Sequence, residues 1–230
     1  MKIVILAAGK GSRLSKSILP KPLTLLSDGK SILQHQIEAL EQYFSRHDIM
    51  VVVGYHKELI IEANDDLLFV YAPGYAKENT SKSLLRAIKK CEDDFLWING
   101  DLLFHPSIIG KLIAQKRTTM VVTKRPVGEE EVKYTTTSEG RITAVSKTIV
   151  AGEGEAIGIN FFTAESLPLL QETLEACQDS DYFEKAIEMC ISEGLKVWSC
   201  PVENSLCTEI DFPSDLEHAN FLLKTWQFKS

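Results

Sequence analysis

Apolar and polar residues alternate along the first hundred positions in a pattern that predicts strands and helices in turn. Four short apolar runs have the length and composition of strands buried on both faces, at residues 3–6, 49–53, 67–71 and 95–98. Between them, apolar residues recur at helical spacing, at residues 32–44, 55–64 and 81–91. Ser31 is the predicted N-cap of the first of these helices, and Thr80 or Ser81 is the predicted N-cap of the third. This alternation predicts a parallel sheet with right-handed crossovers and with helices on both faces.

The second half of the chain has a different pattern. Three predicted strands follow one another with short connections, as in an antiparallel lobe, at residues 131–137, 141–147 and 156–162. The remaining elements are helices at 108–115, 165–177, 182–192 and 213–226 and strands at 119–123 and 196–200. We therefore predict an α/β fold: a Rossmann-like, mostly parallel central sheet flanked by helices on both faces, with a small antiparallel lobe in the second half. Because no linker or repeat interrupts the pattern, residues 1–230 are expected to form a single domain with halves at 1–125 and 126–230.

Composition narrows the class of protein only a little. The chain is 44% hydrophobic and 25% charged, which is ordinary for a globular protein and excludes disordered or fibrous classes. Its net charge of −7 speaks against sequence-independent binding to nucleic acid or to an anionic membrane. No apolar run approaches the ~18 residues of a membrane span, and no basic leader precedes the first strand. We expect a cytoplasmic protein with neither a nucleic-acid nor a membrane partner, and its five cysteines, which lack C-x-x-C spacing, are expected to be reduced.

The loop after the first strand is the strongest chemical feature. Its side chains become small at Ala7, Ala8, Gly9 and Gly11. Backbone N–H groups from residue 8 to residue 12 are therefore uncovered and available to a phosphate chain. Arg13 and Lys21 add positive charge, and the prolines on either side of Lys21 restrict its backbone. Together these features predict a polyphosphate site.

Two familiar phosphate loops do not fit this stretch. A P-loop requires G-x-x-x-x-G-K-[ST], but Thr24 stands where the first glycine of that motif would precede Gly29, Lys30 and Ser31. A dinucleotide fingerprint requires a third glycine or alanine where this chain has Leu14. The loop therefore belongs to another class of nucleotide site.

Residues 6–14 (LAAGKGSRL) and 20–23 (PKPL) resemble the signature of the sugar-nucleotidyltransferase superfamily, L-A-A-G-x-G-[ST]-R-[LM] followed by P-K-[PAQ]-L. Residues 204–216, with Glu209 and Asp211, look like the C-terminal segment of its phosphocholine cytidylyltransferases. The resemblance implies transfer of CMP from CTP, or of another nucleotide, to the phosphate or phosphonate of a small acceptor, with release of pyrophosphate. Such acceptors include phosphocholine, 2-aminoethylphosphonate and sugar or polyol phosphates. It also implies Mg²⁺ as cofactor, a nucleotide-binding half at 1–125 and an acceptor-binding half at 126–230.

The same resemblance assigns roles to individual residues. Lys21 is expected at the α-phosphate and Arg13 at the β- and γ-phosphates, and with Asp101 and Asp211 they form the expected catalytic set. The expected nucleotide-binding residues are Leu6, Ala7, Ala8, Gly9, Gly11, Ser12, Arg13, Lys21, Asn79, Ser83 and Gly100. Asp101 and Asp211 are expected to hold Mg²⁺ through hard oxygen ligands, with Glu209 as an additional ligand. From the residues alone, Asp101 is also explained as a turn former or helix cap, and Asp211 as the N-cap ahead of Pro213.

Acceptor residues are less specific. Lys147 resembles the lysine that sugar nucleotidyltransferases use on the acceptor phosphate, although an exposed strand lysine explains it equally well. Glu155, with Glu153, precedes the segment around Gly158 where a sugar enzyme binds hydroxyls. The two glutamates have two further explanations, neutralising an ammonium group of the acceptor or forming a solvated acidic loop.

Three other functions stay open at this point. One is a thymidylyltransferase or uridylyltransferase acting on a hexose 1-phosphate. A metal-dependent glycosyltransferase is a second, but it would want a D-x-D sequence where this chain has Asn99. The third is a non-catalytic nucleotide-binding subunit, which would be expected to lose Lys21 or a metal carboxylate. The acceptor, and whether the protein is a monomer or a homodimer, are left open.

Overall fold

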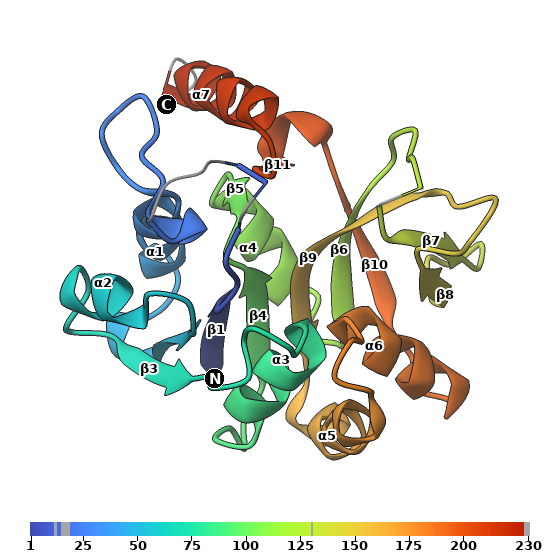
Figure 1. Cartoon of the computed structure of the whole chain (residues 1–230). Helices are drawn as coiled ribbons and strands as arrows, with labels where there is room; N and C mark the ends of the chain where they lie inside the picture. Colours follow the sequence, from blue (N-terminus) through green and yellow to red (C-terminus); the bar gives the residue numbers. More distant parts are fainter. Residues whose placement is uncertain (12, 15–18, 130, 228–230) are drawn as a thin grey trace.

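The computed structural model describes residues 1–11, 13–14, 19–129 and 131–227, and within these ranges nine strands form one large sheet. Along the main path of that sheet the strand order is β10-β6-β9-β4-β1-β2-β3 (Figure 1). The bounds of these strands are Lys2–Ala7 (β1), Ile49–Val53 (β2), Leu68–Tyr71 (β3), Phe95–Asn99 (β4), Thr119–Thr123 (β6), Gly154–Phe162 (β9) and Trp198–Val202 (β10).

Strand β1 is the centre of the parallel part of the sheet. It pairs in parallel with both β2 and β4, so that Ile5 lies opposite Val51 on one side and Ile98 on the other. Its side chains alternate between two cores: Val4 and Leu6 belong to one cluster, and residues 3 and 5 belong to the other. This explains why the strand is apolar at every position from Ile3 to Ala7.

Helices cover both faces of the sheet. One core packs against α3 (Thr80–Ile88), α5 (Leu167–Ala176) and α6 (Phe183–Ser192). The opposite core packs against α1 (Ile32–Glu41), α2 (Lys57–Glu62) and α4 (Ser107–Ile113). The predicted fold class, a mostly parallel sheet flanked by helices, is therefore confirmed. Whether the chain is best divided at residue 125 remains a prediction.

The predicted antiparallel lobe is joined to the main sheet through β9. This nine-residue strand is antiparallel to both β4 and β6, and its first residues pair with β7 (Lys133–Thr136). Strand β7 in turn pairs with β8 (Ile142–Ser146). The lobe is thus an extension of the sheet, built on one long strand.

A second, two-stranded sheet was not predicted. It consists of β5 (Leu102–Phe104) and β11 (Cys207–Glu209), which run antiparallel. Leu103 and Ile210 pack with residues of the last helix, α7 (Pro213–Gln227), and with Leu14 and Leu26. The C-terminal segment is thereby fixed above the loop that follows β1, where Figure 1 shows α7.

Short elements and helix ends complete the chain. Four 3₁₀ turns span Lys21–Leu23, Arg46–Asp48, Ala164–Ser166 and Asn204–Leu206. Ser31 caps α1 as predicted, with its Oγ accepting a hydrogen bond from the Gln34 amide at 3.1 Å. Helix α3 is capped by Asn79, not by the predicted Thr80 or Ser81, because its side chain accepts from the Thr80 amide at 2.8 Å. No helix among the described residues is long and apolar enough to cross a membrane.

Candidate active site

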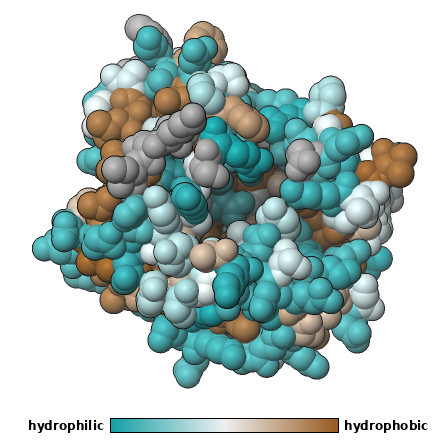
Figure 2. Space-filling view, viewed as in Figure 1, coloured by the Kyte–Doolittle hydropathy of each residue, from teal (hydrophilic) through white to brown (hydrophobic). Residues whose placement is uncertain are grey.

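A cavity of about 710 Å³ opens beyond the carboxyl ends of β1 and β4. Ligands of open parallel sheets bind at this edge, because the loops that leave neighbouring strands converge there. Figure 2 shows the corresponding hollow in the middle of one face, surrounded largely by hydrophilic residues. Many of the predicted site residues line it: Leu6, Ala7, Gly9, Gly11, Arg13, Lys21, Asn79, Gly100, Asp101, Lys147, Glu155, Glu209 and Asp211.

The glycine loop forms one wall of the cavity. Gly11 has φ +61°, and a Cβ atom at this position would lie 2.4 Å from the Cβ of Lys21. A side chain there would therefore be strained in its backbone and would displace the lysine. Ser12, which we predicted to bind nucleotide, lies outside the described residues.

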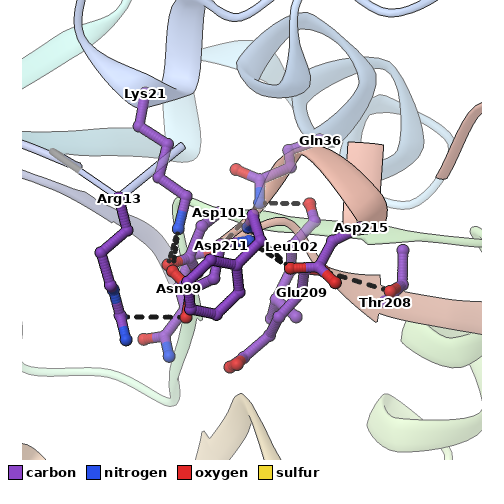
Figure 3. Close-up of polar contacts among 11 residues, drawn as sticks. Arg13, Lys21, Gln36, Asn99, Asp101, Leu102, Thr208, Glu209, Asp211 and Asp215 are labelled. Atoms are coloured by element: carbon purple, nitrogen blue, oxygen red, sulfur yellow. Dashed lines mark hydrogen bonds and ion pairs between the residues drawn. The ribbon is translucent and has the colours of Figure 1, made fainter. Parts of the chain in front are cut away.

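Lys21 joins the two predicted metal ligands. Its Nζ donates to Asp101 Oδ2 at 2.9 Å and to Asp211 Oδ1 at 2.6 Å (Figure 3). Arg13 Nη2 donates to the other oxygen of Asp211 at 2.9 Å. Four side chains separated by up to 198 positions in the sequence thus form one set of ion pairs. The expected catalytic residues lie together at one place in the cavity.

The small second sheet explains how the two aspartates meet. Asp101 directly precedes β5, and Glu209 at the end of β11 lies opposite Leu102 in β5. The Ile210 amide then donates to the Asp101 carbonyl at 3.0 Å. Asp211 is the next residue, and its carboxylate therefore lies close enough to that of Asp101 for Lys21 to bind both. This sheet could not be predicted from the sequence pattern, because each of its strands has only three residues.

The turn between β4 and β5 is held from two sides. The Gly100 amide donates to the Leu6 carbonyl at 3.0 Å, and a Cβ atom on Gly100 would lie 2.6 Å from that oxygen. From the other side, the buried Gln36 side chain donates to the carbonyls of Asn99 and Leu102, both at 2.8 Å. Gln36 was not predicted as a site residue. A glutamine among the apolar positions of the helix at 32–44 was the signal for it.

The capping explanation of Asp211 does not match the contacts. The Asp215 carboxylate accepts from the amides of residue 211 and Phe212, at 2.9 and 2.7 Å, and so binds the backbone at the start of α7. The Asp211 carboxylate instead accepts from Lys21 and Arg13. Its side chain is thus directed toward the cavity and away from the helix end.

Burial and the neighbouring carboxylates change the pKa values of Lys21 and Glu209. Burial disfavours the ammonium charge of Lys21, but the carboxylates of Asp101 and Asp211 outweigh burial and raise its pKa. Burial and the neighbouring carboxylates, Asp101 foremost among them, together raise the pKa of Glu209 to about 8. A cation bound beside Glu209 would favour its ionised form and so oppose both causes of the raised pKa.

The carboxylates fit a magnesium ion that is shared with a ligand. Asp101 Oδ1 is buried and has no hydrogen-bond partner among the described residues, so one hard oxygen is left without a donor. Mg²⁺ is commonly bound by one or two carboxylates together with substrate phosphates. Within the described ranges no group of three or more His, Cys, Asp or Glu side chains is arranged to hold a metal ion by itself. Glu209 as an additional ligand remains a prediction.

The predicted acceptor residues Lys147 and Glu155 also line the cavity, and Glu155 lies close to Glu209. Glu155 in β9 is buried and forms an ion pair with Arg125, while burial raises the pKa of its carboxyl group. Lys147 follows β8, and its Nζ lies 4.6 Å from the centre of the Tyr182 ring. Arg125, Tyr182 and Glu184 also line the cavity, and Arg125 and Glu184 were not predicted. Arg125 lies two residues after a predicted strand, which is the one signal that pointed to it.

Three predicted residues have structural contacts that explain them. Gly158 has φ +71°, and a Cβ atom on it would lie 2.3 Å from the Asn99 side chain, so this glycine permits close packing of β9 against β4. Ser83 is buried within α3. Asn79 caps α3, and its Nδ2 also donates to the Ser180 carbonyl at 3.2 Å. Contacts of these residues with a nucleotide or acceptor remain predictions.

Two known proteins resemble the chain over nearly its whole length, and a third resembles about half of it. The uridylyltransferase AglF of Haloferax volcanii, a UTP–glucose-1-phosphate enzyme, is 28% identical over 95% of both chains. The CMP-5'-(3-aminopropyl)phosphonate synthase of Streptomyces rubellomurinus is 26% identical over 96% of this chain and 38% of its own length. The bifunctional protein GlmU of Methanococcus maripaludis is 40% identical, but over 47% of this chain, and the match spans only 26% of that relative's length.

Solved structures share the fold. The CTP:phosphocholine cytidylyltransferase LicC of Streptococcus pneumoniae superposes with a TM-score of 0.79 at 22% identity, covering 96% of this chain and 98% of its own. The inositol-1-phosphate CTP transferase of T. maritima gives a TM-score of 0.80 at 20% identity, covering 97% and 95%. The family described as the MobA-like NTP transferase domain matches residues 3–181. Because that match includes the glycine loop, Lys21, Asp101 and Lys147, the chain belongs to the MobA-like NTP transferase family, among nucleotidyltransferases of the sugar-nucleotidyltransferase kind.

Proposed function

We propose that this protein transfers CMP from CTP to the phosphate or phosphonate group of a small acceptor and releases pyrophosphate. The observation that carries the proposal is the Lys21 ammonium, which lies between Asp101 and Asp211 beside the glycine loop. This arrangement places one fixed positive charge and two hard-ligand carboxylates at a single point of the cavity. A nucleotidyl transfer needs both of these, because charge develops at the α-phosphorus as the bond to pyrophosphate breaks.

The chain's own residues then have separate tasks. The backbone of the glycine loop and Arg13 bind the β- and γ-phosphates, and Lys21 binds the α-phosphate. An oxygen of the acceptor forms a bond to the α-phosphorus, while the bond from that phosphorus to the bridging oxygen breaks and its electron pair leaves with pyrophosphate. The acceptor oxygen is already ionised, so the site needs no general base. Catalysis then depends on positioning and on neutralising charge.

Asp101 and Asp211 would hold Mg²⁺, which neutralises phosphate charge when it is bound. Both carboxylates accept hydrogen bonds from Lys21, so the lysine turns its ammonium from them toward the phosphate oxygens when it binds the α-phosphate. Glu209 lies beside them, and we propose it as an additional ligand. The acidic surroundings that raise its pKa support a cation at this place.

Cytosine is the base we favour. The CMP-5'-(3-aminopropyl)phosphonate synthase, which matches 96% of this chain, is named for a CMP product. LicC and the inositol-1-phosphate enzyme are named for CTP. The second candidate is transfer of UMP to a hexose 1-phosphate, because AglF is named for UTP and glucose 1-phosphate and matches 95% of both chains. Both candidates use the same phosphate site and differ in the base and in the acceptor.

The test is a measurement of pyrophosphate release in the presence of Mg²⁺. CTP, UTP and dTTP are each combined with phosphocholine, phosphoethanolamine, 2-aminoethylphosphonate, glucose 1-phosphate and inositol 1-phosphate. We expect release with CTP and a non-hexose acceptor. Release with UTP and glucose 1-phosphate alone would establish the second candidate instead. Nucleotide binding without release from any pair would show a non-catalytic nucleotide-binding subunit.

A further inference from the structure

Glu184 is a buried carboxylate in the first turn of α6 that the mechanism above does not use. It lines the cavity, only 9% of its surface is exposed, and its Oε2 has no hydrogen-bond partner among the described residues. An acid in the first turn of a helix is ordinary when water solvates it. A buried carboxylate oxygen without a donor costs free energy. A ligand in the cavity would supply the missing donor.

The surroundings of Glu184 attract positive charge. Tyr182, two residues earlier, already has an ammonium over its ring, because Lys147 Nζ lies 4.6 Å from the ring centre. Helix α6 packs against β8, and Lys147 directly follows that strand. Glu131 lines the same cavity, and its Oε2 is likewise buried without a partner in the part of the chain that the structure describes. The cavity therefore holds two buried carboxylate oxygens without donors among the described residues, and the Lys147 ammonium and the Tyr182 ring lie on the side of Glu184.

The charge of Lys147 does not fully compensate Glu184. Burial raises the pKa of Glu184 to about 7, while its own backbone amide and the Lys147 charge act in the opposite direction and offset burial only in part. A second cation, brought by the ligand, would offset more of this cost. The ligand at this end of the cavity is therefore expected to carry positive charge in addition to its phosphate.

We propose that Glu184 determines acceptor specificity by accepting a hydrogen bond from a primary ammonium group, so that the preferred acceptor is a short aminoalkyl phosphonate or phosphate. This inference rests on the proposed nucleotidyl transfer. A trimethylammonium group has no N–H to donate, and a hydroxyl group donates but carries no charge. Carboxylate oxygens without donors therefore favour the primary ammonium over both.

Two pairs of acceptors test the inference, each differing at a single group. 2-Aminoethylphosphonate and 2-hydroxyethylphosphonate differ only in the ammonium, and phosphoethanolamine and phosphocholine differ only in its methylation. We measure kcat/KM for pyrophosphate release with CTP and Mg²⁺. In each pair we expect the primary ammonium compound to be preferred on the order of 100-fold, the discrimination typical of a buried charged hydrogen bond.

Glu184→Gln tests the residue itself, and Glu193→Gln is its control. Glu193 is an exposed glutamate at the C-terminal end of the same helix, so the control removes the same charge. In Glu184→Gln we expect the preference to fall to roughly 10-fold or less, through a higher KM for the ammonium acceptors and with an unchanged KM for CTP. Glu193→Gln is expected to behave as the unmodified protein.

Other results would overturn the inference. Equal use of both members of each pair would do so, and so would a uniform loss with all four acceptors in Glu184→Gln, because Glu184 would then only position Lys147. Calorimetric titration with the same acceptors, with and without α,β-methylene-CTP and Mg²⁺, separates this result from failure of the proposed function. Selective binding of the ammonium compounds without pyrophosphate release would leave the inference standing and refute the transfer. No binding and no release with any ammonium compound would refute the inference.

Discussion

The two ends of the cavity differ in how their charges are paired. At the nucleotide end, Lys21 and Arg13 bind the carboxylates of Asp101 and Asp211 in one connected set, with distances of 2.6–2.9 Å. At the acceptor end, the part of the cavity around Lys147 and Glu184 that we propose binds the acceptor, Glu184 has a buried oxygen that no described residue satisfies. Asp101 Oδ1 at the nucleotide end likewise has no donor among the described residues, but there the proposed metal accounts for it. The nucleotide end is preorganised for the phosphate chain that we propose it binds, and this chain is the same in every reaction of this kind. The second end has polar atoms that only a particular ligand would satisfy.

The difference separates catalysis from specificity. If it is correct, substitutions at the nucleotide end lower turnover with every acceptor, whereas substitutions at the acceptor end change the ranking of acceptors. A substitution that changed both turnover and the ranking of acceptors would show that the two ends do not act separately. The predictions below test this separation.

The largest effect is expected from Asp101→Ala. The carboxylate is a predicted Mg²⁺ ligand and also binds Lys21, so its loss removes a metal ligand and leaves the lysine misplaced. We expect pyrophosphate release to fall by roughly 1000-fold or more with all acceptors. Asp65→Ala, which removes an exposed aspartate, is the matched control. Activity that persists at saturating Mg²⁺ would place the metal on other residues.

Lys21→Ala is expected to follow. The lysine is buried between two carboxylates and is the closest cation to the position proposed for the α-phosphate. Its removal is expected to lower kcat by roughly 100-fold, the loss typical of one preorganised electrostatic group. Lys90→Ala removes an exposed lysine and is expected to leave kcat unchanged. Circular dichroism of each variant separates loss of activity from loss of fold, and a near-normal kcat in a folded Lys21→Ala would refute the assigned role.

These two residues also show how much of the site the sequence could predict. The glycine loop, Lys21 and Arg13 lie close together in the sequence, so a local motif shows them as one unit. Asp101 closely follows a buried strand, and Asp211 stands two residues after Glu209, so the sequence points to each aspartate separately. Their meeting depends on the pairing of β5 with β11, two three-residue strands too short to be recognised by periodicity.

The acceptor end was harder to predict for a different physical reason. Glu184 has the sequence context of an ordinary helix-start glutamate, and only the packing of α6 against β8 buries it. Gly158 illustrates the converse, because its most evident role is to let β9 approach the Asn99 side chain. The alternation of apolar runs with segments of helical spacing predicted the fold, because the burial of strands and helices depends on local patterns of this kind. Contacts between loops depend on the whole topology, and local periodicity does not contain them.

A smaller effect is expected from Gln36→Leu. The Gln36 side chain donates to two carbonyls on either side of the Gly100–Asp101 turn, and leucine would leave both acceptors without a donor. We expect a destabilisation of about 2 kcal/mol and a decrease in kcat/KM of roughly 10-fold, through displacement of Asp101. Gln34→Leu is the control on the exposed side of the same helix. The apparent Mg²⁺ affinity is the decisive measurement, because loss of stability alone would leave it unchanged.

The smallest effect concerns stability, and it tests whether the acceptor end carries an uncompensated charge. The pKa of Glu184 is about 4.5 in an unfolded chain and about 7 in the folded protein, where burial raises it and its own backbone amide and the Lys147 charge oppose burial in part. The folded state therefore holds this proton more tightly, so rising pH destabilises the fold between pH 4.5 and 7, and the cost is complete above pH 7. Glu184→Gln has no such cost, and its Tm is expected to exceed that of the unmodified protein by roughly 5 °C at pH 8 and by much less at pH 5. Parallel Tm curves would show that Glu184 is already compensated within the protein, which would remove the contrast between the two ends of the cavity; Glu193→Gln is expected to give such parallel curves, because that glutamate is exposed.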